Sequence, residues 1–171
     1  MSDGGPGAAL RALVAAAVGD DRADPANAVT VVERGDDPGP AARIAGFLGR
    51  DGEADAGEAV VGVVPRVDPS LARRLARDPD AETRLVFTGS AGERLDGPAA
   101  PAIRSALAAH GVEPYRHSGD SPVAVLLVGD RAVVGLFDGR GLAAAGWSDA
   151  APVREWVAET CRRFLADAEP A

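Results

Sequence analysis

Three short apolar runs near the carboxyl end of the chain, residues 123–128, 132–137 and 142–147, limit the possible fold more than any other part of the sequence. Segments 129–131 and 138–141 separate the runs and contain glycine and aspartate. These residue types supply the positive φ angles that a tight reversal needs, so the pattern predicts three antiparallel strands in a meander. The first run is apolar at nearly every position, which predicts a strand that is covered on both faces.

The rest of the chain alternates between helical and strand patterns. The predicted helices cover residues 8–18, 40–50, 69–77, 98–110 and 152–167; the predicted strands before the meander cover residues 28–33, 58–64, 83–88 and 112–116, and residues 89–97 are expected to form a loop. This order predicts an α/β fold with a mixed sheet, parallel in its first part and antiparallel in its second, and with helices on both faces. Residues 1–7 are expected to be a disordered tail, and residues 8–171 a single domain.

The charge composition argues against several classes of partner. The 171 residues carry a net charge of −8, and all 18 basic residues are arginine. An acidic chain without a basic cluster repels phosphate backbones, so we do not expect this chain to bind nucleic acid directly. Arginine without lysine, beside abundant aspartate and glutamate, fits two causes equally well: a high-salt (halophilic) cytoplasm and a GC-rich genome.

The sequence shows no targeting, membrane or metal-binding pattern. No run approaches the roughly 20 apolar residues that span a bilayer, and the first seven residues are acidic rather than basic, unlike a signal peptide. Cys161 is the single cysteine, which excludes an internal disulfide and a cysteine-based metal cluster. No histidines or carboxylates have the spacing of a known metal motif. We therefore expect a cytoplasmic protein without a membrane segment, a metal or a cofactor.

One histidine lies among residues that could support nucleophilic chemistry. His117 is next to Ser118 and near Asp120, which raises the hypothesis of a hydrolase that uses His117. However, adjacent residues of one loop rarely converge on one point, and no G-x-S-x-G elbow accompanies them. We therefore expect no catalytic residue.

Residues 65–70 are a candidate ligand site, because they join a buried strand to the next helix. Asp68 is suited to cap that helix, and Pro69 to its first position. Ligands of α/β proteins bind where strands end, free helix amides attract anions, and Arg66 would add positive charge. The alternative is an ordinary capped helix start. Large aromatic residues in the last quarter, such as Trp156 and Phe164, either pack in the core or line a pocket or dimer seam.

Seven segments, taken in order, resemble a known family. They are VVPRVDPSLARRL (63–75), TRLVFTGS (83–90), VEPYRH (112–117), SPVAVLLVGDRAVVGLFDGRG (121–141), WSD (147–149), REW (154–156) and RRFLADAEP (162–170). Together they cover about two thirds of the chain. The set resembles the effector (middle) domain of archaeal winged-helix regulators of the methanogenesis-regulatory, filament-formation type, which is related to the sensor domain of TrmB-type regulators.

The resemblance implies a phospholipase-D-like α/β fold that is used for ligand sensing rather than catalysis. The phospholipase D reaction needs a His-x-Lys motif, and a chain without lysine cannot supply it. Such effector domains usually follow a winged helix-turn-helix. Here the sequence departs from the family pattern, because residues 1–50 hold two predicted helices and a strand but no basic recognition helix.

The leading hypothesis is a non-enzymatic effector domain of a transcription-regulator family, which senses a small anionic ligand or a partner protein without itself reading DNA. The expected ligand site comprises Arg66, Asp68, Ser70, Tyr115, His117 and Asp138. Two alternatives remain. The chain is a structural partner that dimerises with itself or with a winged-helix paralogue, through the helix over 152–167 or the edge of the meander, or it is the hydrolase described above.

Overall fold

The computed structural model describes residues 4–19, 29–48, 59–66, 83–109 and 111–171. Its helices are α1 (Pro6–Val18), α2 (Pro40–Leu48), α4 (Gly89–Arg94), α5 (Ala100–Ala109) and α6 (Ala151–Asp167). Its strands are β1 (Thr30–Glu33), β2 (Val60–Val64), β3 (Thr83–Phe87), β4 (Val112–Arg116), β5 (Ala124–Val128), β6 (Arg131–Asp138), β7 (Gly141–Ser148) and β8 (Glu169–Pro170). The helix predicted over residues 69–77 lies outside the described residues.

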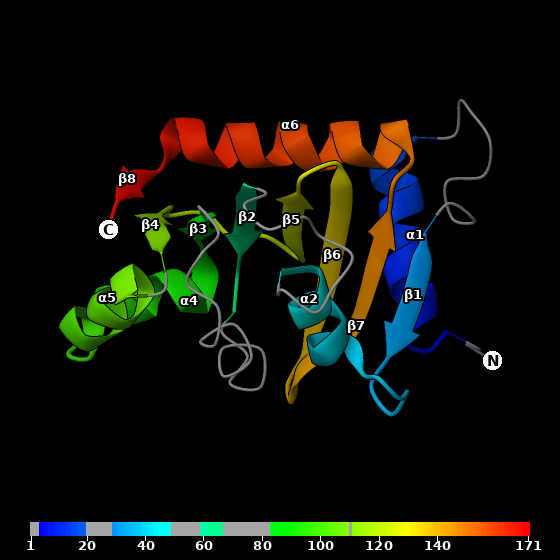
Figure 1. Cartoon of the computed structure of the whole chain (residues 1–171), viewed down its shortest axis with the longest axis horizontal. Coiled ribbons are helices and arrows are strands. Elements are labelled where there is room, and N and C mark those ends of the chain that lie inside the picture. Colours follow the sequence, from blue (N-terminus) through cyan, green and yellow to red (C-terminus); the bar gives the residue numbers. More distant parts are fainter. Residues whose placement is uncertain (1–3, 20–28, 49–58, 67–82, 110) are drawn as a thin grey trace.

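All eight strands form one mixed sheet in the order β1-β7-β6-β5-β2-β3-β4-β8 (Figure 1). β2, β3 and β4 run parallel, whereas β5, β6 and β7 form the predicted antiparallel meander. β2 joins the two halves, since it pairs parallel with β3 and antiparallel with β5. The predicted mixed α/β architecture is therefore confirmed.

Helices cover both faces of the sheet, as predicted. α1 and α6 pack on one face around the buried residues Leu10, Val14 and Val157. α2, α4 and α5 pack on the other, where Ile44 and Leu95 are buried. Alternate residues of β5 enter the two clusters, so this strand is covered on both sides. α6 crosses the upper ends of the central strands (Figure 1).

Four local predictions were wrong or incomplete. The first strand does not join the parallel group; β1 pairs antiparallel with β7 and forms an edge of the sheet. The segment predicted as a loop over 89–97 contains α4, because burial of Ala91 and Leu95 (each 1% exposed) stabilises a turn that the local glycines disfavour. The short strand β8 has no pattern of its own and is defined by its pairing with β4. α1 also begins at Pro6, inside the predicted tail.

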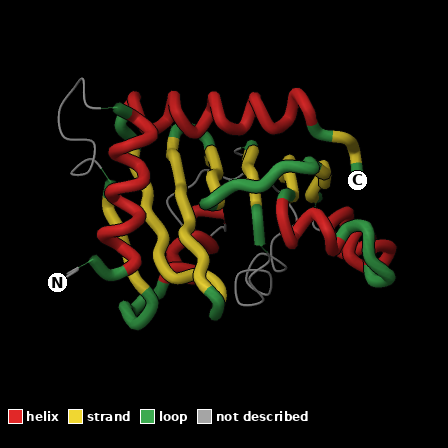
Figure 2. Tube along the Cα trace, turned by 180° about the vertical axis from the view of Figure 1, so that it is seen from behind, coloured by secondary structure: helices red, strands yellow, loops and turns green. Residues whose placement is uncertain are grey.

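The connection between β4 and β5 brings distant segments together. It crosses the face of the sheet that carries α6, over the lower parts of β3 and β2 (Figure 2). The amide of Gly89 donates a hydrogen bond to the carbonyl of Gly119 in this connection, at 3.2 Å. One end of the sheet holds the carboxyl ends of β2, β3 and β4 and also the turn between β6 and β7 (Figure 1). This end, where strands finish, is here called the lower edge; it is distinct from the edge strands β1 and β8.

Candidate functional site

The centre of the candidate site is Asp138, at the end of β6 on the lower edge. Arg34, just after β1, binds its carboxylate through both terminal nitrogens, at 2.9 and 2.8 Å. The same guanidinium also donates to the carbonyl of Leu142, at 3.1 Å. The amide of Arg140 donates to Asp138 Oδ1 at 2.8 Å and closes the turn between β6 and β7. These bonds hold Asp138 in one orientation.

The hydrogen bonds also keep Asp138 ionised. The bonds from Arg34 and from the amide of Arg140 lower the pKa of the Asp138 carboxyl from its usual value of 3.8 to about 2. The carboxylate is therefore neutralised by Arg34 and already accepts several donors. It serves as a fixed anchor rather than as an acid or base at neutral pH.

Arg66 extends from the end of β2 to the same residue. Its Nη1 donates to the main-chain carbonyl of Asp138 at 3.2 Å, and its side chain is exposed. Within the described part of the chain, Arg66 makes no ion pair with a carboxylate. Its guanidinium is held in place by a neutral carbonyl.

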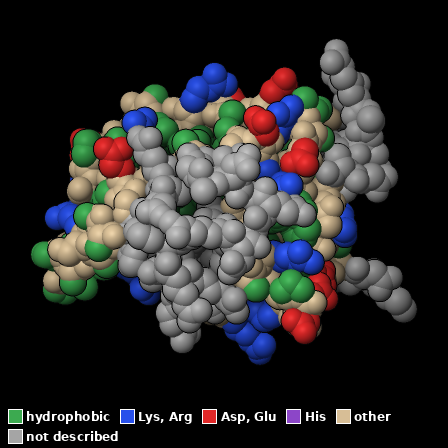
Figure 3. Space-filling model, viewed as in Figure 1, with side chains coloured by type: hydrophobic (Ala, Val, Ile, Leu, Met, Phe, Trp, Pro, Cys, Tyr) green, Lys and Arg blue, Asp and Glu red, His purple; other side chains and the backbone are tan. Residues whose placement is uncertain are grey.

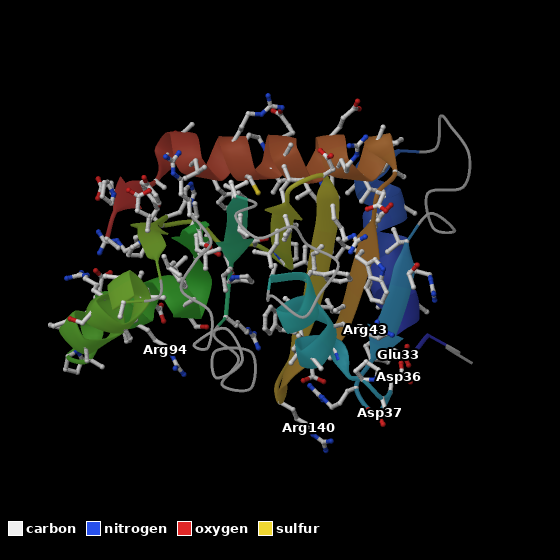
Figure 4. All side chains as sticks on the ribbon, in the orientation of Figure 1. Glu33, Asp36, Asp37, Arg43, Arg94 and Arg140 are labelled. Carbon is white, nitrogen blue, oxygen red and sulfur yellow. The ribbon has the colours of Figure 1, made fainter. Side chains whose placement is uncertain are left out.

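A second arginine without a carboxylate partner among the described residues lies on the same edge. The side chain of Arg140 projects away from the turn between β6 and β7 (Figure 4). Six of the eleven other described arginines make ion pairs with carboxylates, which are Arg34–Asp138, Arg84–Glu113, Arg116–Asp96, Arg116–Glu169, Arg131–Asp149, Arg154–Asp130 and Arg162–Glu159. Both signs of charge are exposed along the lower edge (Figure 3).

Three acidic residues of the lower edge, Glu33, Asp36 and Asp37, lie at the turn after β1 (Figure 4). Two of them have structural roles. Glu33 Oε1 accepts a hydrogen bond from the amide of Gly7 at 2.7 Å, and Asp36 Oδ2 accepts one from the amide of Glu33 at 2.7 Å. Another carboxylate of this edge, Asp120, lies against Gly89 just after β3.

The structure brings together Arg66 and Asp138 of the six predicted site residues. Asp68 and Ser70 lie outside the described residues. Tyr115 in β4 packs against the core on the α6 face. His117, just after β4, places its ring 4.8 Å from that of Phe164 in α6, edge to face. Among the described contacts, none joins Tyr115 or His117 to Arg66 or Asp138.

The surroundings of His117 do not form a catalytic triad. Its Nδ1 accepts a hydrogen bond from the amide of Gly119 at 2.8 Å, whereas a triad histidine donates from Nδ1 to a carboxylate. The carboxylate of Asp120 instead accepts from the amide of Ser121, at 2.8 Å. In this structure His117 connects the loop after β4 to α6.

Sequence reasoning missed Arg34. It lies 104 residues from Asp138, and no local pattern distinguishes it from the other arginines. Among the described residues there is no cluster of three or more potential metal ligands, and no helix is long and apolar enough to cross a membrane.

The fold places the chain among phospholipase-D-like α/β domains. It is similar to Nuc, a phospholipase D family member from Salmonella typhimurium, with a TM-score of 0.60 and 13% identity over 84% of this chain and 97% of that one. It is also similar to TrmBL2, described as an archaeal chromatin protein with a novel mode of DNA binding (TM-score 0.53, 16% identity, 95% of this chain). The chain spans 60% of the length of TrmBL2. No curated protein sequence matches the chain.

The sequence identifies the family. Residues 44–167, more than half of the chain, match the model of the middle domain of the methanogenesis regulatory protein FilR1. The chain belongs to this FilR1 middle-domain family, as the sequence segments indicated. It is therefore a domain of a regulatory-protein family.

Proposed function

We propose that this chain is a cytoplasmic, non-enzymatic effector domain that senses a small anionic ligand at the lower edge, without itself reading DNA. The observation that carries the proposal is the arrangement at Asp138. Arg34 neutralises the carboxylate, while Arg66 and Arg140 flank it without a carboxylate partner among the described residues. Guanidinium groups bind carboxylates and phosphates through paired hydrogen bonds, so a small multivalent anion suits this edge.

The overall charge supports a role outside direct DNA contact. At a net charge of −8 the chain repels phosphate backbones at long range. A small anion can still approach Arg66, because at physiological or higher salt the surrounding carboxylates are screened beyond about 8 Å. The domain would then act on transcription through a DNA-binding partner, such as a winged-helix paralogue. His117 contributes to this domain as a structural contact with Phe164, not as a catalytic base.

The test compares anion binding by two arginine variants. Inorganic phosphate and citrate are titrated by calorimetry into the wild-type protein, Arg66→Ala and Arg163→Ala at constant ionic strength. Arg163 is an exposed arginine of α6 and controls for the lost charge. Because hydrogen bonds to charged groups contribute about 1.5–3 kcal/mol, Arg66→Ala should weaken binding by roughly 10- to 100-fold, with an unchanged melting temperature. Equal affinity in all three proteins would contradict the proposal, as would binding of duplex DNA at physiological salt.

A structural-partner role is the second candidate function. β1 is an edge strand of the sheet, so its outer side is not paired with another described strand. Edge strands offer unpaired amide and carbonyl groups to a second chain. If this role applies, sedimentation in molar salt should show a dimer that a proline at Val31 disrupts. A monomer at high protein concentration would argue against self-association.

A further inference from the structure

A hollow of about 690 Å³ lies beneath α6, at the end of the sheet opposite the lower edge. Its described lining comes from the amino ends of β2 and β3, the carboxyl end of β5 and the second half of α6. Its apolar walls come from Val61, Leu127, Ala158 and Leu165, together with the thiol of Cys161. This volume lies within the range of about 300–1,000 Å³ that is typical of small-molecule sites.

The two charged residues among the described lining residues are both arginines. Arg84 and Arg162 contribute to the wall, whereas the carboxylates that pair with them, Glu113 and Glu159, do not. Both ion pairs are exposed, with more than half of each side chain accessible to solvent. Exposed pairs contribute little to stability, so a ligand carboxylate can compete for either guanidinium. The described lining is thus apolar inside, with two guanidinium groups at its rim that take part in exposed ion pairs.

We infer that this hollow is a binding site for an amphipathic carboxylate, that is, a short aliphatic chain with an anionic head. The aliphatic part would lie against Val61, Leu127 and Leu165, and the head would contact Arg162 or Arg84. The site is separate from Asp138 and does not depend on the ligand proposed for the lower edge.

The inference is tested with sodium octanoate as the probe. Octylammonium, which has the same alkyl chain but the opposite charge, is the control. Calorimetry should show that octanoate binds at least tenfold more tightly than octylammonium. Ala158→Phe fills the hollow without changing charge and should weaken octanoate binding at least tenfold; Ala166→Phe, at an exposed position of the same helix, should not. Arg162→Ala should weaken binding by about threefold, whereas the neighbouring Arg163→Ala should leave it unchanged.

Cys161 provides a readout that needs no substitution. Its side chain is 2% exposed, and burial raises the pKa of its thiol to about 12, so alkylation of the wild-type protein is slow. Bound octanoate should slow it further, by at least threefold at saturation. Four results would each overturn the inference. They are no detectable binding at 10 mM octanoate, equal binding of octylammonium, an unchanged alkylation rate, and full octanoate binding by a folded Ala158→Phe variant. Loss of octanoate binding in Arg66→Ala would also overturn it, because that result would place the ligand at the lower edge.

Discussion

Gly62 in the central strand β2 offers a direct test of how the sheet is packed. A Cβ atom built at this position would lie 2.2 Å from Leu126 Cδ2 and 2.9 Å from the carbonyl oxygen of Val125, both in the neighbouring strand β5. The side chain of Leu126 occupies the space above the glycine and is only 7% exposed. Gly62→Ala therefore forces either Leu126 or the strand pairing to shift.

The expected cost follows from these distances. Extra methyl groups in a packed core typically cost about 1–3 kcal/mol, while replacing glycine with alanine recovers about 0.4–1 kcal/mol by restricting the unfolded chain. Since one of the close atoms is main chain, we expect Gly62→Ala to lower the free energy of unfolding by about 1–2 kcal/mol. Gly46→Ala is the matched control. Gly46 lies in α2, and outside its own helix backbone no atom of the described residues lies within 4 Å of the added Cβ, so this change should be neutral or stabilising by up to about 1 kcal/mol.

Urea unfolding followed by far-ultraviolet circular dichroism measures both variants on the same scale. A double variant then tests the cause. Leu126→Ala removes the atom nearest the new methyl group, so Gly62→Ala should cost less in that background, by at least about 1 kcal/mol of coupling. If Gly62→Ala behaves like Gly46→Ala, or if the two changes at Gly62 and Leu126 are additive, the packing argument is refuted.

Two further predictions concern the lower edge. Because the pKa of Asp138 is lowered to about 2 in the folded protein, the stability that this carboxylate contributes is complete above pH 4 and is lost as the pH falls towards 2. The difference in unfolding free energy between the wild type and Asp138→Asn should therefore shrink over this interval. A difference that stays constant would count against this role of Asp138. Glu33 supplies the carboxylate that accepts the Gly7 amide at the start of α1, where Gly5 has no side chain to cap the helix. Glu33→Ala should thus cost about 0.5–2 kcal/mol in urea unfolding, and an unchanged midpoint would show that the contact is not stabilising.

Elements with a strong local pattern could be predicted from the sequence. The meander β5–β7 follows from three apolar runs separated by turn residues, and α6 from the spacing of Val153, Val157 and Cys161. α4 could not be predicted, because its local sequence disfavours a helix and its stability comes from burying Ala91 and Leu95. Local propensity is weak where tertiary burial opposes it.

The candidate site was predictable only in part. Arg66 and Asp138 were selected because they follow strands, and strand ends are where α/β domains hold ligands. Their contact, however, depends on β2 lying next to the meander, which the register of β2 with β5 establishes. Arg34 joins them because β1 pairs with β7 instead of with the parallel strands.

The amino-acid sequence alone determined the class of fold, the acidic and lysine-free surface and the family, since all three depend on composition and on patterns within short segments. The tertiary structure alone decided which charges meet. Pairing energies between strands are similar for several arrangements, and only the packing of all the elements together selects one. That selection places Arg34 and Arg66 on Asp138, and it forms the apolar hollow beneath α6 at the opposite end of the sheet.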